Sequence, residues 1–352
     1  ALPLGAYNFL GKGYMIRQDI REKLGIEPIK THEDLVKFMY AVKEKEPNVI
    51  PFTVPRDDLS LNAGMKLLTD YETHVRPTPL TYALPLYFKN NDGKVYNLFD
   101  EMDAKVEAAF KEYRTFFVDG IMHQDIMGVK SSRDVFISGK TAVIATNDFG
   151  VPANVTAKLV ESVPGAKTEF VTFLDASQKK ISGFLQWNFI AVPINSKHKE
   201  RAIQFLNWAN QKENYDLLAY GIEGKHWIAE GDDQYKPGPD AKKYRWFPYA
   251  WIWNPAQERL NATLPKEVND MNRWAKDANN FIPDKTLGFS FDTAPVVNEI
   301  AQFNALIDQY YKPLALGVVD YDKTWAEFKS KAADITKKIQ EEMQKQIDAS
   351  LK

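Results

Sequence analysis

Apolar residues recur at helical spacing in several parts of the chain. After Thr31, a favourable N-cap, Leu35, Met39 and Val42 lie on one face of a segment that Pro47 ends. The same spacing predicts further helices over residues 103–118, from 199 toward Gly221, over 266–280 and 293–310, and from Lys323 onward. The last of these segments has the apolar stripe of an amphipathic helix that docks on the body of the protein.

Short apolar runs between these helices predict strands. They are YMIR from Tyr14, TAVIAT over 141–146, TEFVTFL from Thr168 and WNFIAVPI from Trp187. Because helices alternate with such strands and no internal repeat is evident, the sequence predicts the α/β class with mainly parallel sheets flanked by helices. Residues 51–98 are expected to form loops and a hairpin, with a turn at NNDG over 90–93.

Length and charge narrow the possible classes of protein. The 352 residues, 44% of them hydrophobic, favour two globular lobes over one. The formal net charge is -2, with 45 basic and 47 acidic residues spread along the chain, so a nucleic-acid partner is not expected. The chain has no cysteine, which excludes disulfides and thiolate metal sites. No apolar run approaches the roughly 18 residues that span a membrane.

The sequence offers no recognisable catalytic, cofactor or metal motif. Its five histidines are scattered, and it contains no HExxH, GxSxG, P-loop or GxGxxG pattern. NNDG lacks the alternating ligands of a calcium loop. We therefore expect no cofactor and no catalytic residue. A glycoside-active enzyme, which needs only two carboxylates, stays open as an alternative because nothing among the acidic residues selects or excludes a pair.

Several stretches carry a further pattern, in this order: GYMIRQDIREKLGIEPIKTHEDLVKFMYAVKEKEP, FISGKTAVIATNDF, WNFIAVPINSKHKERAIQFLNWANQKENYDLLAYGIEGKHW, LGFSFDTAPVVNEIAQF and YYKPLALGVVDYD. Together they resemble the extracellular solute-binding proteins of the family 1 type, in particular the oligosaccharide-binding lipoprotein branch. His32 and Asp34 fill part of that family's helix start, whose usual Trp is absent here. Family members carry further residues before the point that matches Ala1, so the resemblance implies a fragment, a split product or a processed chain.

The resemblance implies a two-lobed fold of the type II periplasmic-binding-protein kind, with hinge crossings and a ligand cleft that closes by hinge motion. It implies a carbohydrate ligand, specifically an oligosaccharide as in the branch that the stretches resemble, and a membrane permease as partner. The protein would be a monomer outside the cell, a lipid-anchored protein of a Gram-positive bacterium or a periplasmic one. A binder of another polar ligand, such as a peptide, is the alternative.

The resemblance also divides the chain into expected parts. They are a hinge crossing at 1–10, a C-terminal lobe at 11–184, a return segment of the N-terminal lobe at 185–230, a cleft-crossing segment with C-terminal-lobe helices at 231–322, and a C-terminal helix at 323–352.

Candidate ligand residues combine aromatic rings with polar neighbours, since sugars present flat C–H faces and many hydroxyl groups. The chain is rich in such rings, with 8 Trp, 16 Tyr and 21 Phe, although any one ring can equally serve packing. The candidates are Asn147, Asp148 and Phe149 after a strand, Trp187 and Asn188 at a crossing, Trp246, Trp251 and Trp253 in an irregular segment, Phe291 and Asp292, and Tyr7 and Tyr14. His226 and Trp227 are expected to be structural, beside tight turns at Gly221 and Gly224.

Overall fold

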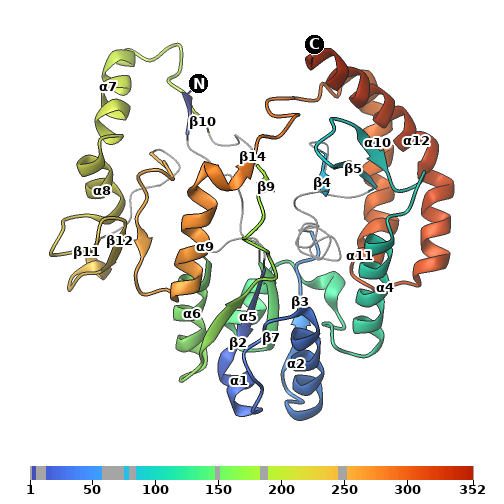
Figure 1. Ribbon diagram of the computed structural model, residues 1–352, viewed down its shortest axis with the longest axis horizontal. Coiled ribbons are helices and arrows are strands. Elements are labelled where there is room, and N and C mark those ends of the chain that lie inside the picture. The colour runs from blue at the N-terminus through green and yellow to red at the C-terminus, as the bar shows by residue number, and fades with distance from the viewer. Residues whose placement is uncertain are drawn as a thin grey trace. The chain divides into compact units, whose positions relative to one another are not determined.

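The computed structural model describes residues 2–4, 13–57, 75–78, 85–146, 151–182, 189–244 and 252–351. The chain forms two compact units (Figure 1). Unit 1 comprises Ala1–Leu10 and Ser182–Phe281, and unit 2 comprises Gly11–Ile181 and Ile282–Lys352. Each unit is described separately below, and the predicted boundaries of the lobes stay a prediction.

The main sheet of unit 2 has four strands in the order β3-β7-β2-β8. The strands are β2 (Gly13–Arg17), β3 (Ile50–Thr53), β7 (Thr141–Thr146) and β8 (Thr168–Val171). Strand β2 is antiparallel to both of its neighbours, whereas β3 and β7 are parallel, so β3, β7 and β8 share one direction. We call the edge where these three strands end and β2 begins the carboxyl edge.

Helices cover both faces of this sheet. On one face lie α2 (His32–Lys45) and α4 (Ala104–Val118), whose Phe38 and Phe110 belong to the same core cluster as Phe52 of β3. The other face packs Ile144 against α5 (Ser132–Ile137) and α6 (Val151–Ser162). The short helix α1 (Gln18–Lys23) follows β2.

The cap predicted for α2 is confirmed. The Thr31 hydroxyl accepts a hydrogen bond from the Asp34 backbone N–H at 3.1 Å, and the Asp34 carboxylate accepts one from the Thr31 N–H at 3.0 Å. This reciprocal pair satisfies two of the amide groups that a helix start leaves without partners, which is why the helix begins here.

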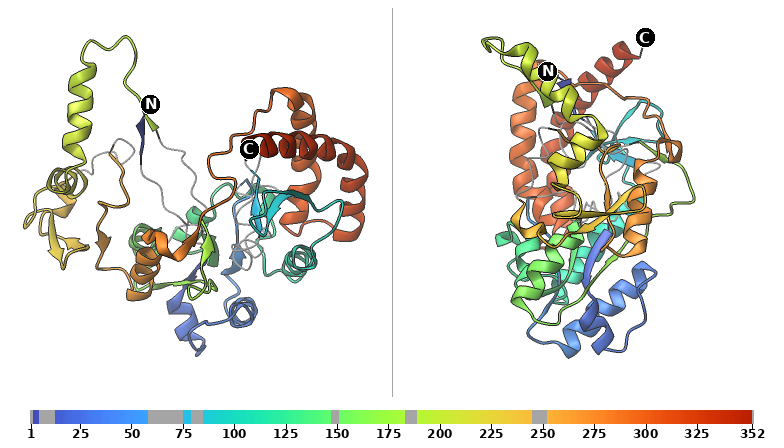
Figure 2. Two further views of the ribbon diagram at one scale, coloured as in Figure 1. Left: turned by 45° about the horizontal axis from the view of Figure 1, so that its top comes forward. Right: turned by 90° about the vertical axis from the view of Figure 1, so that its left-hand side faces the viewer.

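A helical layer completes unit 2. It contains α10 (Val297–Leu306), the π turn η7 (Ile307–Tyr311), α11 (Lys312–Ala315) and α12 (Tyr321–Ser350), and Figure 2 shows α10 and α12 adjacent in both views. The amphipathic prediction for the last helix is confirmed, because its buried residues include Phe328, Ala332, Ile339, Met343 and Ile347. These residues recur at spacings of three, four and seven, so they form one stripe.

A small antiparallel sheet of β4 (Val75–Pro77), β5 (Leu86–Lys89) and β6 (Val95–Asn97) lies beside α12. The Gln344 side chain accepts a hydrogen bond from the Val95 N–H at 2.8 Å. The NNDG turn joins β5 to β6 as expected, with left-handed backbone at Asn90 (φ 57°), Asn91 (φ 52°) and Gly93 (φ 80°). Asparagine and glycine adopt this conformation at least cost.

Unit 1 combines helices α7 (Lys199–Ala209), α8 (Lys212–Tyr220) and α9 (Lys266–Lys276) with short strands. Strands β11 (Trp227–Glu230) and β12 (Gln234–Pro237) are antiparallel, and β13 (Leu260–Asn261) is parallel to β12. Strands β1 (Leu2–Pro3) and β10 (Phe189–Ile190) form an antiparallel pair. The α/β class is confirmed, but the expectation of mainly parallel sheets is not met among the described strands, because most strand pairs of both units are antiparallel.

The remaining described elements are short. They are β9 (Lys180–Ile181), β14 (Phe281–Ile282), η2 (Ile126–Gly128), η3 (Ala241–Lys243), η5 (Ala278–Asn280) and η6 (Ala294–Val296). Across the part of the chain that the structure describes, every helix is either too short or too polar to cross a membrane.

The turn around Gly221 and His226 is structural, as expected. Gly221 has φ 88°, and a side chain there would place its Cβ 2.5 Å from His226 Nδ1. His226 Nδ1 accepts a hydrogen bond from the Ile222 N–H at 3.0 Å, and the Trp227 indole N–H donates to the Gly221 carbonyl at 2.9 Å. These bonds fix the path of the chain from α8 into β11.

Candidate functional site

An aromatic group lies at the carboxyl edge of unit 2. The Tyr14 ring, which is buried, has its centroid 6.2 Å from that of Phe52 and 5.9 Å from that of Phe173, just beyond β8. His32, the first residue of α2, meets Phe173 edge-on at 6.0 Å, and its Nε2 lies 2.8 Å from a Glu112 carboxylate oxygen. The predicted ligand residue Tyr14 thus sits within a packed group of rings, and its ligand role stays a prediction.

Charged residues follow β3 at the same edge. Arg56 donates two hydrogen bonds to Asp57, from Nε to Oδ1 at 3.0 Å and from Nη2 to Oδ2 at 2.6 Å. Lys312 Nζ lies 3.0 Å from Asp57 Oδ1 and 2.6 Å from Asp308 Oδ1. We call these four residues the edge network. The hydrogen bond from Arg56, followed by that from Lys312, lowers the pKa of Asp57 to about 2.

Two threonine hydroxyls are buried where β3 and β7 end. Thr53 and Thr146 are both almost fully buried, and among the described residues neither hydroxyl has a hydrogen-bond partner. Since Thr53 is paired with Ile144, and Ile144 and Thr146 are two positions apart on β7, both side chains lie on the face covered by α5 and α6. The ends of β3 and β7 therefore carry two buried hydroxyl groups that have no hydrogen-bond partner among the described residues.

The closing-segment candidates lie in unit 2. The Phe291 ring is half-buried, packs on the main core and has its centroid 6.5 Å from that of Phe289. Asp292 is exposed, and its Oδ1 accepts a hydrogen bond from the Ala294 N–H at 3.0 Å, while its backbone bonds to the Gln346 side chain. Asp292 therefore orders the start of η6, and its predicted contact with ligand stays a prediction.

Among the candidates of the irregular segment, the structure describes Trp253, whose side chain is half-buried in unit 1. The remaining predicted ligand residues lie outside the described residues. They are Tyr7, Asn147, Asp148, Phe149, Trp187, Asn188, Trp246 and Trp251.

Sequence reasoning missed the edge network. Arg56 and Asp57 follow the apolar strand IPFT just as Asn147–Phe149 follow TAVIAT, so the same signal could have found them. Lys312 gives no comparable signal, because it lies 255 residues from Asp57 in the sequence.

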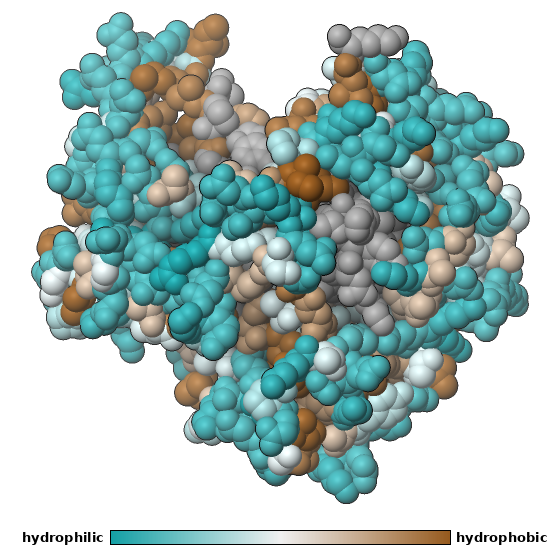
Figure 3. All heavy atoms as spheres, in the orientation of Figure 1, coloured by the Kyte–Doolittle hydropathy of each residue, from teal (hydrophilic) through white to brown (hydrophobic). Residues whose placement is uncertain are grey.

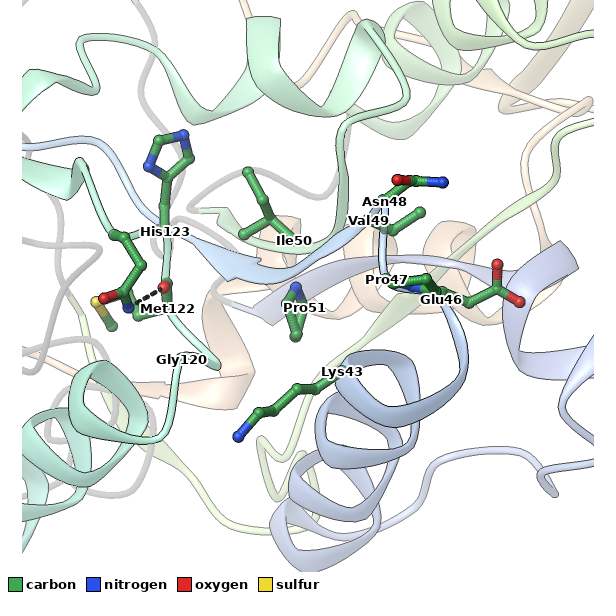
Figure 4. A pocket seen from close by; sticks show the side chains of 11 residues that line it. Lys43, Glu46, Pro47, Asn48, Val49, Ile50, Pro51, Gly120, Met122 and His123 are labelled. Carbon is green, nitrogen blue, oxygen red and sulfur yellow. Dashed lines mark hydrogen bonds between the residues drawn. The ribbon is translucent and has the colours of Figure 1, made fainter.

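A hollow opens at the opposite edge of the main sheet (Figure 4). It lies between Lys43 near the end of α2, the start of β3, and the segment from Gly120 to Gln124, where the Gln124 side-chain amide donates to the Met122 carbonyl at 3.1 Å. A second hollow lies along α12, beside Val95. Neither hollow is lined by a predicted ligand residue. The described residues contain no cluster of three or more His, Asp and Glu side chains that could hold a metal ion.

Comparison with known sequences finds a relative that matches along the whole chain. A carbohydrate ABC transporter substrate-binding protein of Streptococcus pneumoniae is 24% identical, with 100% of this chain and 69% of that protein covered. An uncharacterized protein from the butB 5' region of Niallia circulans is 31% identical over 116 residues, covering 31% of this chain and 44% of that protein. A family model described as a domain of unknown function, DUF3502, matches residues 285–352.

Solved structures with a similar fold are solute-binding proteins. The N-glycan transport solute binding protein NgtS of S. pneumoniae has a TM-score of 0.74 at 21% identity, covering 99% of this chain and 74% of that chain. An HMO-binding ABC-transporter solute-binding protein of Bifidobacterium longum infantis has a TM-score of 0.63 at 15% identity, covering 99% and 76%. The alginate-binding protein AlgQ2 has a TM-score of 0.60 at 18% identity, covering 99% and 74%.

These matches define the class of the fold, which is the α/β fold of the type II periplasmic solute-binding proteins. The resemblance to ABC-importer solute-binding proteins, predicted from the quoted stretches, is confirmed by a relative that matches along the whole chain.

Proposed function

We propose that this chain is the substrate-binding component of an ABC importer and captures a carbohydrate, specifically an oligosaccharide, for delivery to a membrane permease. The observation that carries the proposal is the match along the whole chain to a protein named as a carbohydrate ABC transporter substrate-binding protein. The fold supports it, because NgtS has been solved in complex with Man1GlcNAc and with Man5GlcNAc.

The proposed site is a cleft between two lobes, closed by hinge motion when ligand binds. Its rings would stack on the C–H faces of the sugar while the polar neighbours bind the hydroxyl groups. The rings of Trp253 in unit 1 and Phe291 in unit 2 support this assignment, since both are only half-buried, and Phe291 packs on the main core of its unit. The candidates outside the described residues belong to the same proposal.

We further propose that the protein performs no chemistry on the sugar. A glycoside hydrolase needs two carboxylates free to act as acid and as base or nucleophile. At the carboxyl edge, Asp57, Asp308 and Glu112 each lie within 3.0 Å of a basic side chain. This pairing supports binding over hydrolysis, as does the transport role named for the full-length relative.

The proposal places the protein outside the cell as a monomer, held near the permease by a lipid anchor. An extracellular location fits a binding component, because the component must bind the sugar before the sugar reaches the membrane. At this location the protein would meet a permease and a free oligosaccharide, which are its proposed partners. We propose no nucleic-acid partner.

A thermal-shift screen against a panel of oligosaccharides tests the function. A ligand that binds only the folded state stabilises it by about 2.7 kcal/mol at a hundred times its Kd, so a specific sugar is expected to raise the melting temperature in a concentration-dependent way. The constituent monosaccharides serve as controls and are expected to shift it less. Mass spectrometry of the same samples should show intact sugar. Shortened sugar, or no shift with any sugar, contradicts the proposal.

A further inference from the structure

The edge network combines opposite charges in equal number. Arg56 and Lys312 supply two cations, and Asp57 and Asp308 supply two carboxylates, so its formal net charge is zero. Each cation already has a carboxylate within 3.0 Å. His32, the other basic residue described above at this edge, lies 2.8 Å from Glu112. An anion arriving here would have to compete with a carboxylate that is already in place.

The backbone holds the network in position. The Arg56 N–H donates to the Val129 carbonyl at 2.8 Å, and Arg56 Nη1 donates to the Met127 carbonyl at 3.4 Å. Asp308 is the second residue of the π turn η7, and Lys312 follows its last residue; the wider winding of such a turn often marks functional sites. Because these side chains are already ordered, a ligand that contacts them loses little additional conformational entropy.

The network is also within reach of a ligand. The side chains of Arg56 and Asp57 are 36% and 49% exposed, so N–H groups and carboxylate lone pairs remain available beyond those used within the network. A planar guanidinium beside a carboxylate offers donors and acceptors that match adjacent sugar hydroxyls. In open α/β sheets, ligands bind outside the carboxyl ends of the strands, which is where these residues lie.

We propose that Arg56 and Asp57, supported by Lys312, contact the hydroxyl groups of the ligand and select a neutral oligosaccharide over an acidic one. The inference rests on the proposed function and names the substrate class of its site. A uronate carboxylate placed here would meet Asp57 at short range and would find every cation of the network paired. A neutral sugar meets no such repulsion and can both donate to Asp57 and accept from Arg56.

Isothermal titration calorimetry with a matched pair of sugars tests the selectivity. One probe is the neutral oligosaccharide that gives the largest thermal shift, and the other is the same molecule after oxidation of its primary hydroxyls to carboxylates. The neutral form is expected to bind at least about tenfold more tightly, which corresponds to about 1.4 kcal/mol. Tighter binding of the oxidised form, or an acidic sugar as the best ligand of the panel, overturns the inference and leaves the proposed function standing. Failure to bind any sugar overturns both.

Substitution of Asp57 by asparagine ties the selectivity to the network. Asp57→Asn leaves the network with an excess positive charge, so affinity for the neutral sugar is expected to fall about tenfold, while its advantage over the oxidised sugar narrows about tenfold. The matched control is Asp233→Asn. Asp233 pairs with Arg273 in the same two-bond manner, at 2.7 and 3.3 Å, with similar side-chain exposures of 54% and 40%. The control is expected to leave both affinities unchanged.

A second substitution covers the case in which Asp57→Asn does not fold. Arg56→Lys keeps the charge but loses the planar pair of donors, so it is expected to weaken binding of the neutral sugar and leave the preference for neutral over oxidised sugar in place. Wild-type affinity for the neutral sugar in a folded Asp57→Asn or Arg56→Lys variant overturns the assignment of the network as a ligand contact.

Discussion

Among the residues that the structure describes, the two units differ in how much apolar surface they bury. In unit 2, one continuous cluster joins the main sheet, α2, α4 and the helical layer, and includes Phe38, Phe52, Phe303 and Phe328. A described cluster of unit 1 contains four buried residues, Ala209, Tyr215, Ala219 and Ile252. The upper left part of Figure 3, which holds α7 and the segment leading into it, shows hydrophobic residues at the surface. Within the described residues, apolar burial therefore contributes more to the stability of unit 2 than to that of unit 1.

Unit 1 also contains a network of charged side chains centred on a buried carboxylate. Asp216 of α8 is buried and binds both Lys212 and Arg259, whose Nε lies 3.0 Å from Asp216 Oδ2. The Arg259 guanidinium also donates to the Asp232 carbonyl at 3.1 Å and lies 4.9 Å from the centre of the Trp227 ring. This network joins α8 to β11 and to the segment before β13. Such networks stabilise a fold only while every member is paired.

Removing a large side chain from the core of unit 2 should have the largest effect. Phe328 is fully buried, and its ring centroid lies 5.0 Å from that of Phe99 and 6.0 Å from that of Tyr310. Phe328→Ala is expected to lower the free energy of unfolding by about 3–5 kcal/mol, because it combines lost burial with a cavity. Urea denaturation followed by circular dichroism measures this. A loss below about 1 kcal/mol would show that the layer of α12 is only loosely coupled to the core.

Breaking the polar network should be nearly as costly for unit 1. Asp216→Ala leaves Lys212 and Arg259 partly buried without their carboxylate and is expected to cost about 3 kcal/mol. Hydrogen exchange should then accelerate in α8 and β11–β13 and stay unchanged in the main sheet of unit 2. The control is Asp270→Ala, which removes an exposed partner of Lys266 and Arg273 and is expected to change the free energy of unfolding far less. Equal costs for the two variants would contradict the contrast between the units.

Sequence reasoning was most successful where the evidence is local. The Thr31 cap, the NNDG turn and the apolar stripe of α12 are each specified by residues within a few positions of one another. It was least informative where distant segments meet, as in the edge network. The apolar run WNFIAVPI predicted a buried strand, yet in its described part, from Phe189 onward, the strand β10 ends at Ile190, and Ile194 is 91% exposed. Hydrophobic residues favour burial, but the sequence of one segment does not specify what covers it.

Acid should weaken unit 2 through the edge network. The pKa of Asp57, ordinarily near 3.8, is lowered to about 2 by Arg56 and Lys312, so its stabilising contribution is present above about pH 4 and is lost as the pH falls toward 2. Because Asp57 is half exposed, the contribution is expected to stay below about 1 kcal/mol. Melting curves between pH 2 and 6 should show a smaller decline on acidification for Asp57→Asn than for wild type. Parallel declines would contradict this role.

The smallest effect is expected on the exposed face of α7. The rings of Phe205 and Trp208 lie on one side of this helix with centroids 5.9 Å apart, and 38% and 40% of these residues is exposed. Trp208→Gln is expected to change the free energy of unfolding by less than about 0.5 kcal/mol, because a surface side chain gives up little burial. Trp227→Gln, at a buried ring of the same unit, should cost several times more. A large loss of stability for Trp208→Gln would mean that this ring is buried against other residues in the folded protein. Unit 1 would then bury more apolar surface, and the difference between the two units would be smaller.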